Sequence, residues 1–306
     1  MKHIGLLLLI LFFSSATQAK IKMAVTVDDL PAHGSLPPNM TREQIVKDFL
    51  KVLKKHKVPE VYAFANAGRH PDKLESEALM KMWVAGGYPL ANHTFMHPRL
   101  KNVTAPEFIK DIEDNESTLQ KLNGQKNWKY FRYPYLHEGD TLEKRNAIRQ
   151  YLKSKNYTIA QVTVDFEDWA WNNPYARCMT KKDKKSVEWL QKTYLESAET
   201  ILDRAVQSSD FVFKKPISHI LLLHFGAFDA AMLDQLLTAY EKKGVEFISL
   251  SEAVRDDVYG IDPGLTFTHG AEFQYQVLKS RNQSAKDAGL APFTGVLDQL
   301  DGVCAK

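Results

Sequence analysis

Short apolar runs alternate with longer segments of helical periodicity along most of the 306-residue chain. Continuous apolar runs bounded by polar residues are typical of strands that are buried on both faces of a parallel sheet. The predicted strands are residues 21–27, 61–65, 88–91, 129–132, 158–164, 217–223 and 245–250. The predicted helices are residues 41–56, 73–85, 106–122, 142–155, 187–206 and 232–243.

The first predicted helix illustrates the pattern. Residues 41–56 place Ile45, Phe49 and Leu53 on one face, and Thr41 is a candidate N-cap. Strand–helix units repeated in series predict an α/β fold with a parallel sheet. We expect a distorted (β/α) barrel of about seven strands rather than an open sheet.

The first 19 residues have the features of a secretory signal peptide in the expected order. Lys2 supplies a positive charge, residues 4–13 form an apolar run too short to span a bilayer comfortably, and residues 14–19 are small or polar. A buried first strand or helix would also be apolar, but it would need neither the charge nor the small-residue end. We therefore expect residues 1–19 to be removed and the protein to be periplasmic or extracellular, without stable membrane insertion.

Composition is that of an ordinary globular protein, with 44% hydrophobic and 25% charged residues. The formal net charge of +3 falls to +2 when Lys2 is removed with the leader, and no basic cluster is interleaved with aromatic residues. We therefore expect no nucleic-acid partner. Cys178 and Cys304 could pair in an oxidising compartment or remain two buried thiols, and the sequence favours neither. It does not indicate the oligomeric state.

Chemically reactive side chains directly follow several of the predicted strands. They are Asp28 and Asp29, His93, Arg132, Asp165 to Asp168, and His224. In βα barrels the carboxyl ends of the strands converge on one face, where active sites are built. We therefore expect these residues to gather in one site.

Two early motifs contain residue types that bind metal ions. Neighbouring residues at the end of a strand point in different directions, so Asp29 could hold a metal while Asp28 acts as a base. An Asp pair before Pro31 could equally form a turn. His93 and His97 have the i, i+4 spacing that places two side chains on one side of a helical turn. With Asp29 they would form a His-His-carboxylate set that leaves a position open for water.

Three later motifs supply candidates for acid–base chemistry. Arg132 could hold a catalytic carboxylate in its ionised form, although an ordinary arginine at a strand end has the same pattern. Residues 165–169 place three carboxylates beside Trp169, and a carboxylate next to a histidine fixes its tautomer and raises its pKa. His224 ends the apolar run 221–223, but a lone histidine there is more often structural. Four further histidines, His33, His70, His137 and His219, are expected to be structural, although the closeness of His33 to Asp29 leaves open that it lines the site.

Five motifs, taken together, resemble those of the NodB-homology polysaccharide deacetylases, carbohydrate esterase family 4. They are TVDD at 26–29, where the family has TFDD, then HTFMH at 93–97, RYPY at 132–135, DFEDW at 165–169 and LLH at 222–224. Each motif alone is weak, but five in order, each at a predicted strand end, are specific. The resemblance extends over roughly residues 21–254.

The resemblance implies a distorted (β/α) barrel that binds a divalent metal, usually zinc. Carried over by matching motif positions, Asp29, His93 and His97 would be the metal ligands. Asp28 would be the general base, and Arg132 would orient it. These assignments agree with the chemistry of amide hydrolysis, in which a metal polarises the carbonyl group and a base activates water.

The resemblance also assigns the remaining parts of the reaction. The backbone N–H of Tyr135 would help to bind the oxyanion, and Asp168 would support His224 as the general acid. Trp169 and Leu222 would shape the pocket for the acetyl group. The implied substrate is an N-acetylated polysaccharide.

Two segments depart from the family pattern. The stretch at about 170–215, before the last motif, is longer than is usual, and residues 259–306 lie beyond the common domain. We therefore divide the chain into a signal peptide at 1–19, a deacetylase domain at 20–258 that contains the insertion, and a C-terminal extension at 259–306 of unknown role.

We expect metal-dependent removal of N-acetyl groups from N-acetylglucosamine units, with peptidoglycan preferred because a signal peptide would place the protein beside the cell wall. Chitin-like chains, poly-N-acetylglucosamine and O-acetyl xylan remain open. A non-catalytic sugar-binding module would have no need of both Asp28 and His224. A cytosolic amidohydrolase acting on a small cyclic amide would have no need of a signal peptide.

Overall fold

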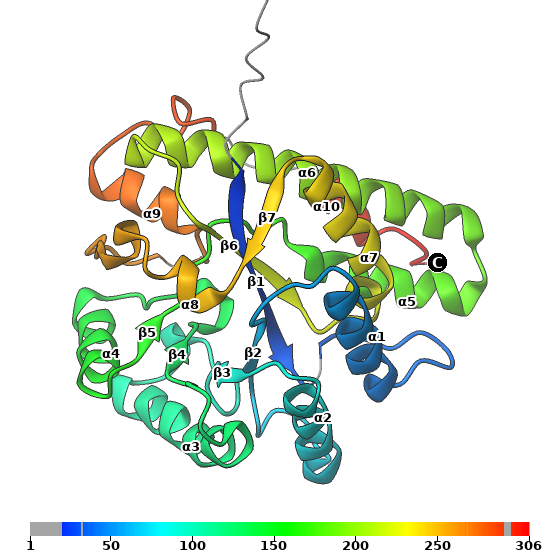
Figure 1. Cartoon of the computed structure of the whole chain (residues 1–306), viewed down its shortest axis with the longest axis horizontal. Helices are drawn as coiled ribbons and strands as arrows, with labels where there is room; N and C mark the ends of the chain where they lie inside the picture. The colour runs from blue at the N-terminus through cyan, green and yellow to red at the C-terminus, as the bar shows by residue number, and fades with distance from the viewer. Residues whose placement is uncertain (1–19, 32, 268, 291–294, 306) are drawn as a thin grey trace, which may run out of the picture.

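The computed structural model describes residues 20–31, 33–267, 269–290 and 295–305. Its centre is a curled parallel sheet in the order β5-β4-β3-β2-β1-β6, with β7 also paired to β1 (Figure 1). The strands are β1 (Ile21–Leu30), β2 (Tyr62–Ala65), β3 (Leu90–Asn92), β4 (Tyr130–Phe131), β5 (Thr158–Ile159), β6 (His219–His224) and β7 (Val245–Ile248). The predicted α/β barrel of about seven strands is confirmed.

The longest strand, β1, organises the sheet. Its first half pairs with β7 and its second half with β2, while β6 pairs along its other side. The chain beyond β5 returns to β6 through the bridge between Val164 and Leu221, so the two sides of the sheet meet. All of these pairings are parallel, so the carboxyl ends of the strands converge on one face.

Helices cover the sheet (Figure 1). They are α1 (Arg42–Lys55), α2 (Lys73–Ala85), α3 (Ala105–Asn123), α4 (Leu142–Ser154), α5 (Asn172–Lys181), α6 (Lys184–Phe213), α7 (Ala227–Lys242), α8 (Leu250–Ala253), α9 (Phe273–Ser280) and α10 (Leu297–Leu300). Short 3₁₀ turns lie at η1 (Leu100–Asn102), η2 (Pro134–Leu136), η3 (Asp168–Trp171) and η4 (Asp257–Gly260). The Thr41 side chain accepts a hydrogen bond from the Gln44 N–H, as its predicted N-cap role requires.

Three predicted elements differ clearly in extent from the structure, and one of them, the helix predicted at 232–243, begins at Ala227 as α7. The strand predicted at 158–164 ends at Ile159, because the chain then leaves β4 and meets β6 only through the bridge at Val164. The helix predicted at 187–206 runs from Lys184 to Phe213. The helix α5 was not predicted; it begins with Asn172, Asn173 and Pro174, which are residue types of low helix propensity.

The helices α5 and α6 lie in the segment that was expected to be an insertion. In Figure 1, α6 runs along one edge of the molecule, with α9 near one of its ends and α5 and α7 near the other. The C-terminal extension crosses this helix. Arg281 donates to the Val212 carbonyl near the end of α6, at 2.6 Å.

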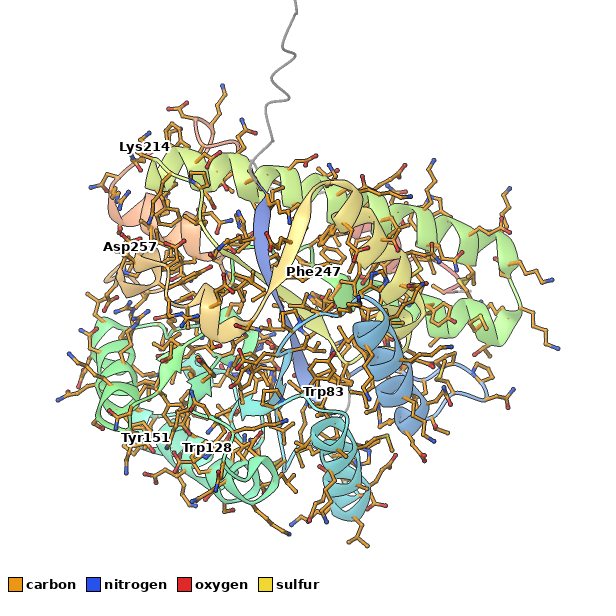
Figure 2. All side chains as sticks on the ribbon, viewed as in Figure 1. Trp83, Trp128, Tyr151, Lys214, Phe247 and Asp257 are labelled. Atoms are coloured by element: carbon orange, nitrogen blue, oxygen red, sulfur yellow. A yellow bond between two sulfur atoms is a disulfide. The ribbon has the colours of Figure 1, made fainter. Side chains whose placement is uncertain are left out.

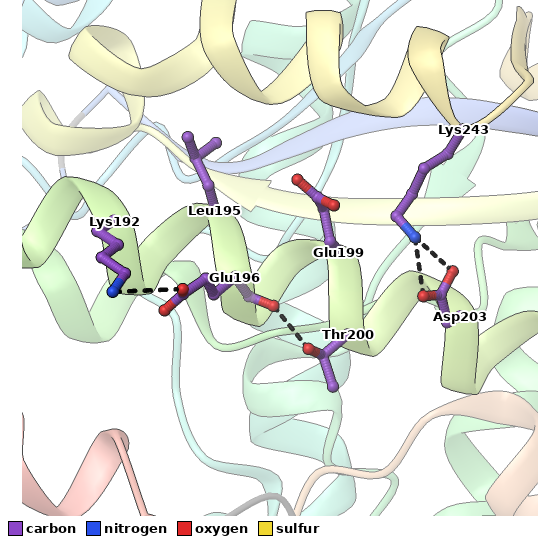
Figure 3. Close-up of a pocket in the computed structure, with 7 residues that line it drawn as sticks. All are labelled: Lys192, Leu195, Glu196, Glu199, Thr200, Asp203 and Lys243. Carbon is purple, nitrogen blue, oxygen red and sulfur yellow. Dashed lines mark hydrogen bonds and ion pairs between the residues drawn. The ribbon is translucent and has the colours of Figure 1, made fainter.

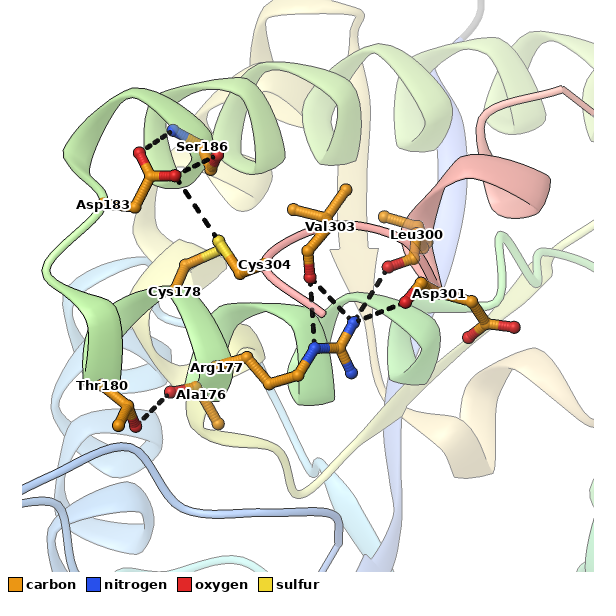
Figure 4. Close-up of a disulfide and its surroundings, with 10 residues drawn as sticks. All are labelled: Ala176, Arg177, Cys178, Thr180, Asp183, Ser186, Leu300, Asp301, Val303 and Cys304. Carbon is orange, nitrogen blue, oxygen red and sulfur yellow. Dashed lines mark hydrogen bonds between the residues drawn. A yellow bond between two sulfur atoms is a disulfide. The ribbon is translucent and has the colours of Figure 1, made fainter. Parts of the chain in front are cut away.

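The end of the extension is joined covalently to α5. Cys178 and Cys304 form a disulfide across 126 residues, which answers the question that the sequence left open (Figure 4). The Arg177 guanidinium donates to the carbonyls of Leu300, Asp301 and Val303, at distances of 2.9–3.1 Å. The last described turn of the chain is therefore held by a disulfide and by charge-assisted hydrogen bonds.

The main core lies between the sheet and the helices α1, α2, α6 and α7. Trp83 is fully buried there, whereas the labelled Lys214 and Asp257 project at the surface (Figure 2). Among the described residues, every helix is too short or too polar to cross a membrane. The predicted signal peptide at 1–19 lies outside the described residues.

Candidate active site

A cavity of about 430 Å³ opens at the carboxyl ends of the strands. Eight of the ten predicted site residues line it: Asp28, Asp29, His93, His97, Tyr135, Trp169, Leu222 and His224. The other two, Arg132 and Asp168, are buried behind Asp28 and His224. The five sequence motifs therefore meet in one place.

A β-bulge explains how adjacent aspartates face the same cavity. Against β2, Asp28 pairs with Phe64 and Leu30 pairs with Ala65, so Asp29 is an extra residue on its strand. Its φ of 68° lies in the left-handed region, which aspartate adopts more readily than most residues. A bulge redirects side chains next to active sites. Here it turns Asp29 toward the cavity beside Asp28.

The second motif is a loop and not a helical turn. Thr94 and His97 both have positive φ, at 65° and 60°, so the prediction that a helical turn pairs the two histidines is wrong. The loop is fixed from within, because Asn92 Oδ1 accepts from the Thr94 N–H and Thr94 Oγ1 accepts from the His97 N–H. Asn66 donates to the carbonyl of His93. These bonds bring the rings of His93 and His97 to a centroid distance of 4.8 Å.

Asp29, His93 and His97 have the geometry of a metal site. One ligand atom from each residue lies within 4.8 Å of the others. His93 Nδ1 is 2.9 Å from the Arg132 carbonyl, which fixes the tautomer that leaves Nε2 free for a metal. Asp29 Oδ1 is buried and faces the Nε2 atoms of His97 and His93, at 3.3 and 3.8 Å, beside an ion pair with Arg69. These observations fit a divalent cation.

The protonation states of these residues also suit a metal. Burial lowers the pKa of His93 and of His97 to about 3, so both rings are neutral at neutral pH. Burial opposes the ionisation of Asp29, but the hydrogen bond from His33 and the charge of Arg69 hold its pKa well below the usual range. Neutral imidazoles and an ionised carboxylate are the forms that bind metal ions.

Asp28 is held by a buried ion pair. Arg132 Nη1 lies 2.7 Å from Asp28 Oδ1, and both side chains are almost completely buried. The same guanidinium donates to Thr26 Oγ1 and to the Ala160 carbonyl. Burial nevertheless raises the pKa of Asp28 above its ordinary value, which moves this carboxylate toward the range where it can accept a proton.

His224 lies beside Asp28 because the two residues are paired across β1 and β6. Its Nδ1 is 2.8 Å from Asp168 Oδ1, and its backbone N–H donates to Asp168 Oδ2 at 2.6 Å. Asp168 thus fixes both the ring and the backbone of His224, and it leaves Nε2 as the ring nitrogen that can exchange a proton with a substrate.

Behind Asp168 lies Asp229, which the sequence did not indicate as a site residue. Both carboxyls are fully buried, and Tyr194 donates to Asp229 Oδ1 at 2.9 Å. Burial raises the pKa of both acids. The two neighbouring carboxyls therefore hold protons more tightly than free carboxylic acids do.

An exposed aromatic pair flanks the cavity. Tyr135 and Trp169 keep 41% and 45% of their surface exposed, so both rings are accessible at the cavity. The Arg99 guanidinium stacks over the Tyr135 ring, 3.6 Å from its centre. Tyr135 has a φ of 59°, so its backbone is in the left-handed region at the turn η2.

His33 lines the cavity, an alternative that its closeness to Asp29 in the sequence had left open, and its Nδ1 lies 2.9 Å from Asp29 Oδ2. Other lining residues were not predicted from the sequence. Arg69 follows β2 and places Nη1 2.6 Å from Asp29 Oδ1. Because Arg69 comes shortly after a predicted strand, its position in the sequence could have indicated that it belongs to the site. His269 and Gly270 come from the C-terminal extension, and no motif pointed to them.

A second hollow lies on the outer face of α6 (Figure 3). Its residues are Lys192, Leu195, Glu196, Glu199, Thr200, Asp203 and Lys243. Lys243 and Asp203 form an ion pair at 2.8 Å, and Lys192 lies 3.8 Å from Glu196. This is a solvated helix face with exposed ion pairs, far from the strand ends that carry the motifs.

Comparison with known proteins agrees with the first three motifs, which lie within the matched segment, and with the fold. A family model described as polysaccharide deacetylase matches residues 15–160. This segment of the chain is therefore similar to the polysaccharide deacetylase family. Over 150 residues it is 29% identical to a peptidoglycan-N-acetylglucosamine deacetylase of Bacillus cereus, an alignment that covers 49% of this chain and 47% of the relative. The chain thus spans about half the length of this curated relative.

Solved structures show that the deacetylase-like fold extends beyond the matched segment. A peptidoglycan deacetylase of Bacillus subtilis superposes with a TM-score of 0.50 at 19% identity, over 88% of this chain and 95% of the other. A family 4 pseudoenzyme of Bacillus anthracis gives 0.52 at 19% identity, over 77% and 66%. At these identities the likeness concerns the fold alone. Since the same fold occurs in a pseudoenzyme, activity has to be argued from the residues of the site.

Proposed function

We propose that this protein is a metal-dependent hydrolase that removes N-acetyl groups from N-acetylglucosamine units of a polysaccharide. The observation that carries the proposal is the placement of a base and an acid on either side of a metal site. Asp28 and His224 are paired across neighbouring strands, and the Asp29, His93 and His97 set lies beside them.

The bound metal would be held by Asp29 Oδ1 and by the histidine Nε2 atoms, and it would polarise the acetyl carbonyl and lower the pKa of water. Two nitrogen ligands and one carboxylate suit zinc and leave room for further ligands. Zinc is therefore the ion that we propose.

The residues of the chain divide the remaining work. Asp28, ionised and held by Arg132, accepts a proton from the attacking water. The backbone N–H of Tyr135 donates to the oxygen that becomes negatively charged. His224, oriented by Asp168, gives its proton to the departing amine. Each acid–base group of this kind typically contributes about 10²–10⁴-fold to the rate.

Peptidoglycan is the substrate that we propose first. The Bacillus cereus relative is named for its action on N-acetylglucosamine in peptidoglycan. The predicted signal peptide would bring the protein to the cell wall, and the disulfide supports an oxidising compartment such as the periplasm or the cell exterior. Chitin-like chains, poly-N-acetylglucosamine and O-acetyl xylan are the alternatives to be compared with it.

A non-catalytic sugar-binding protein is the second candidate, because the fold is shared with a pseudoenzyme. Such a protein would keep aromatic contacts such as Trp169 but would gain nothing from a buried acid pair behind His224. The intact Asp28, Arg132, His224 and Asp168 set therefore favours catalysis.

The test is acetate release from N-acetylated glycans by the zinc-loaded protein. Wild type, Asp28→Asn and the surface control Asp203→Asn are compared, each with and without a chelator. We expect release by wild type and by the control, loss of release with the chelator, and a fall of at least about 100-fold in the Asp28 variant. Sugar binding without acetate release from any glycan would favour the binding protein instead.

A further inference from the structure

The C-terminal extension reaches the active-site cavity. His269 and Gly270, which precede α9, line the cavity together with residues from the strand ends. The family model ends at residue 160, far before this segment. The extension therefore adds to the site a part that the matched family pattern does not include.

On one side, the segment is fixed by hydrogen bonds to main-chain carbonyls of the barrel. The Phe273 N–H donates to the Val162 carbonyl at 2.7 Å, and Gln274 Nε2 donates to the Thr163 carbonyl at 2.8 Å. Phe273 and Gln274 are both buried. Further upstream, Asp262 forms an ion pair with the buried Arg145 of α4. The described residues 269–272 therefore directly precede a segment that is anchored to the barrel.

Gly270 packs directly on the turn that carries Tyr135. A Cβ atom at position 270 would lie 2.4 Å from the Tyr135 carbonyl oxygen and 3.1 Å from Leu136 Cβ. The backbone of Gly270 is not in the left-handed region, so the need for glycine here is steric. The extension thus touches the main chain of the residue whose N–H is assigned to the oxyanion.

The other side of the segment faces the acidic loop after β5. Glu272 is close enough to Asp165 to add to the effect of burial, and together they raise the pKa of Asp165 to about 7. Asp165 and Glu167 of this loop also line the cavity. The segment therefore spans the space between the Tyr135 turn and the loop after β5.

We propose that residues 269–272 form a wall that closes this side of the cavity, so that the site takes the end of a glycan chain or a short N-acetylated oligosaccharide rather than the interior of a long chain. The inference rests on the proposed deacetylase function. The remaining walls come from β1, β6 and the loops after β2, β3, β4 and β5. A volume of about 430 Å³ is at the small end of the range for ligand pockets, about 300–1,000 Å³.

The first test uses the wild-type, zinc-loaded protein and N-acetylglucosamine oligomers from the dimer to the hexamer. We expect kcat/KM to level off by the trimer, and mass spectrometry of the hexamer to show acetate lost from a terminal unit. A rise in kcat/KM of about tenfold or more between trimer and hexamer, with deacetylation of interior units, would overturn the inference, since tenfold is about 1.4 kcal/mol of added contacts.

Variants test the wall itself. His269→Ala should raise the hexamer-to-trimer ratio of kcat/KM and admit interior units. Gly270→Ala should push on the Tyr135 turn and lower kcat with little change in KM or in zinc affinity measured by calorimetry. The matched control is Gly260→Ala, because no atom lies within 4 Å of a Cβ at that position and its φ is also ordinary.

The outcomes separate this inference from the proposed function. An unchanged chain-length profile in His269→Ala, or an unchanged kcat in Gly270→Ala, would contradict the wall even if acetate is released normally. Absence of release from every glycan by wild type would instead overturn the proposed function, and the wall inference with it.

Discussion

Loss of the Cys178–Cys304 disulfide should destabilise the protein strongly. The bridge closes a loop of 126 residues in the unfolded chain. For loops longer than 100 residues, the chain-entropy relation gives about 5 kcal/mol, and removal of native disulfides typically costs about 2–5 kcal/mol. At about 2 °C per kcal/mol for a chain of this size, the full value lowers Tm by about 10 °C.

The assay is thermal unfolding followed by circular dichroism, on metal-free protein so that the reductant does not compete for zinc. Oxidised wild type is compared with wild type in phosphine reductant and with the double variant Cys178→Ala/Cys304→Ala. The double variant should unfold like reduced wild type and should not respond to reductant. A Tm difference of less than about 2 °C between oxidised and reduced wild type would refute the reasoning, since it corresponds to only about 1 kcal/mol.

Three further predictions concern buried groups. Arg132→Ala should lower the free energy of unfolding, measured by urea denaturation, by about 3–5 kcal/mol, because Asp28 is left as an unpaired buried charge. Adding Asp28→Ala should recover part of this loss. If the free-energy changes of the two substitutions simply add, the pairing is contradicted. Tyr194→Phe should cost about 1–3 kcal/mol because Asp229 loses its donor, and a change below about 0.5 kcal/mol would show that this hydrogen bond is weak. The pKa of Asp165 is raised to about 7, so the folded state loses stability as the pH rises from about 4 through 7. The Tm of Asp165→Asn relative to that of wild type should therefore increase between pH 5 and pH 8. A difference in Tm that does not change with pH would contradict the raised pKa.

Much of the barrel could be predicted because its elements have strong local patterns. The helix α2 has the predicted bounds, and β1, β2, β6 and β7 lie within a few residues of the predicted strands. The strand β5 was overestimated because the apolar residues after Ile159 are buried without continuing the pairing with β4. Apolar character indicates burial, but a strand also needs a partner for its backbone.

The candidate site divides in the same way. Residues within motifs, such as Asp28 and His224, could be found because each follows an apolar strand. Asp229 and Gly270 could not, because their roles depend on contacts with Asp168 and Tyr135, which are distant in the sequence. The pairing of His93 and His97 was predicted for the wrong reason, since the loop is held by Asn92 and Thr94 side chains rather than by helical spacing.

The central claim is that Asp28 and His224 catalyse amide hydrolysis at the metal site formed by Asp29, His93 and His97. The most direct measurement is acetate release from N-acetylglucosamine oligomers and peptidoglycan by zinc-loaded wild type, with Asp28→Asn and Asp203→Asn alongside. The account predicts release by wild type and by Asp203→Asn, its loss with a chelator, and its near absence in Asp28→Asn. Release that survives in Asp28→Asn or in the presence of the chelator would contradict it.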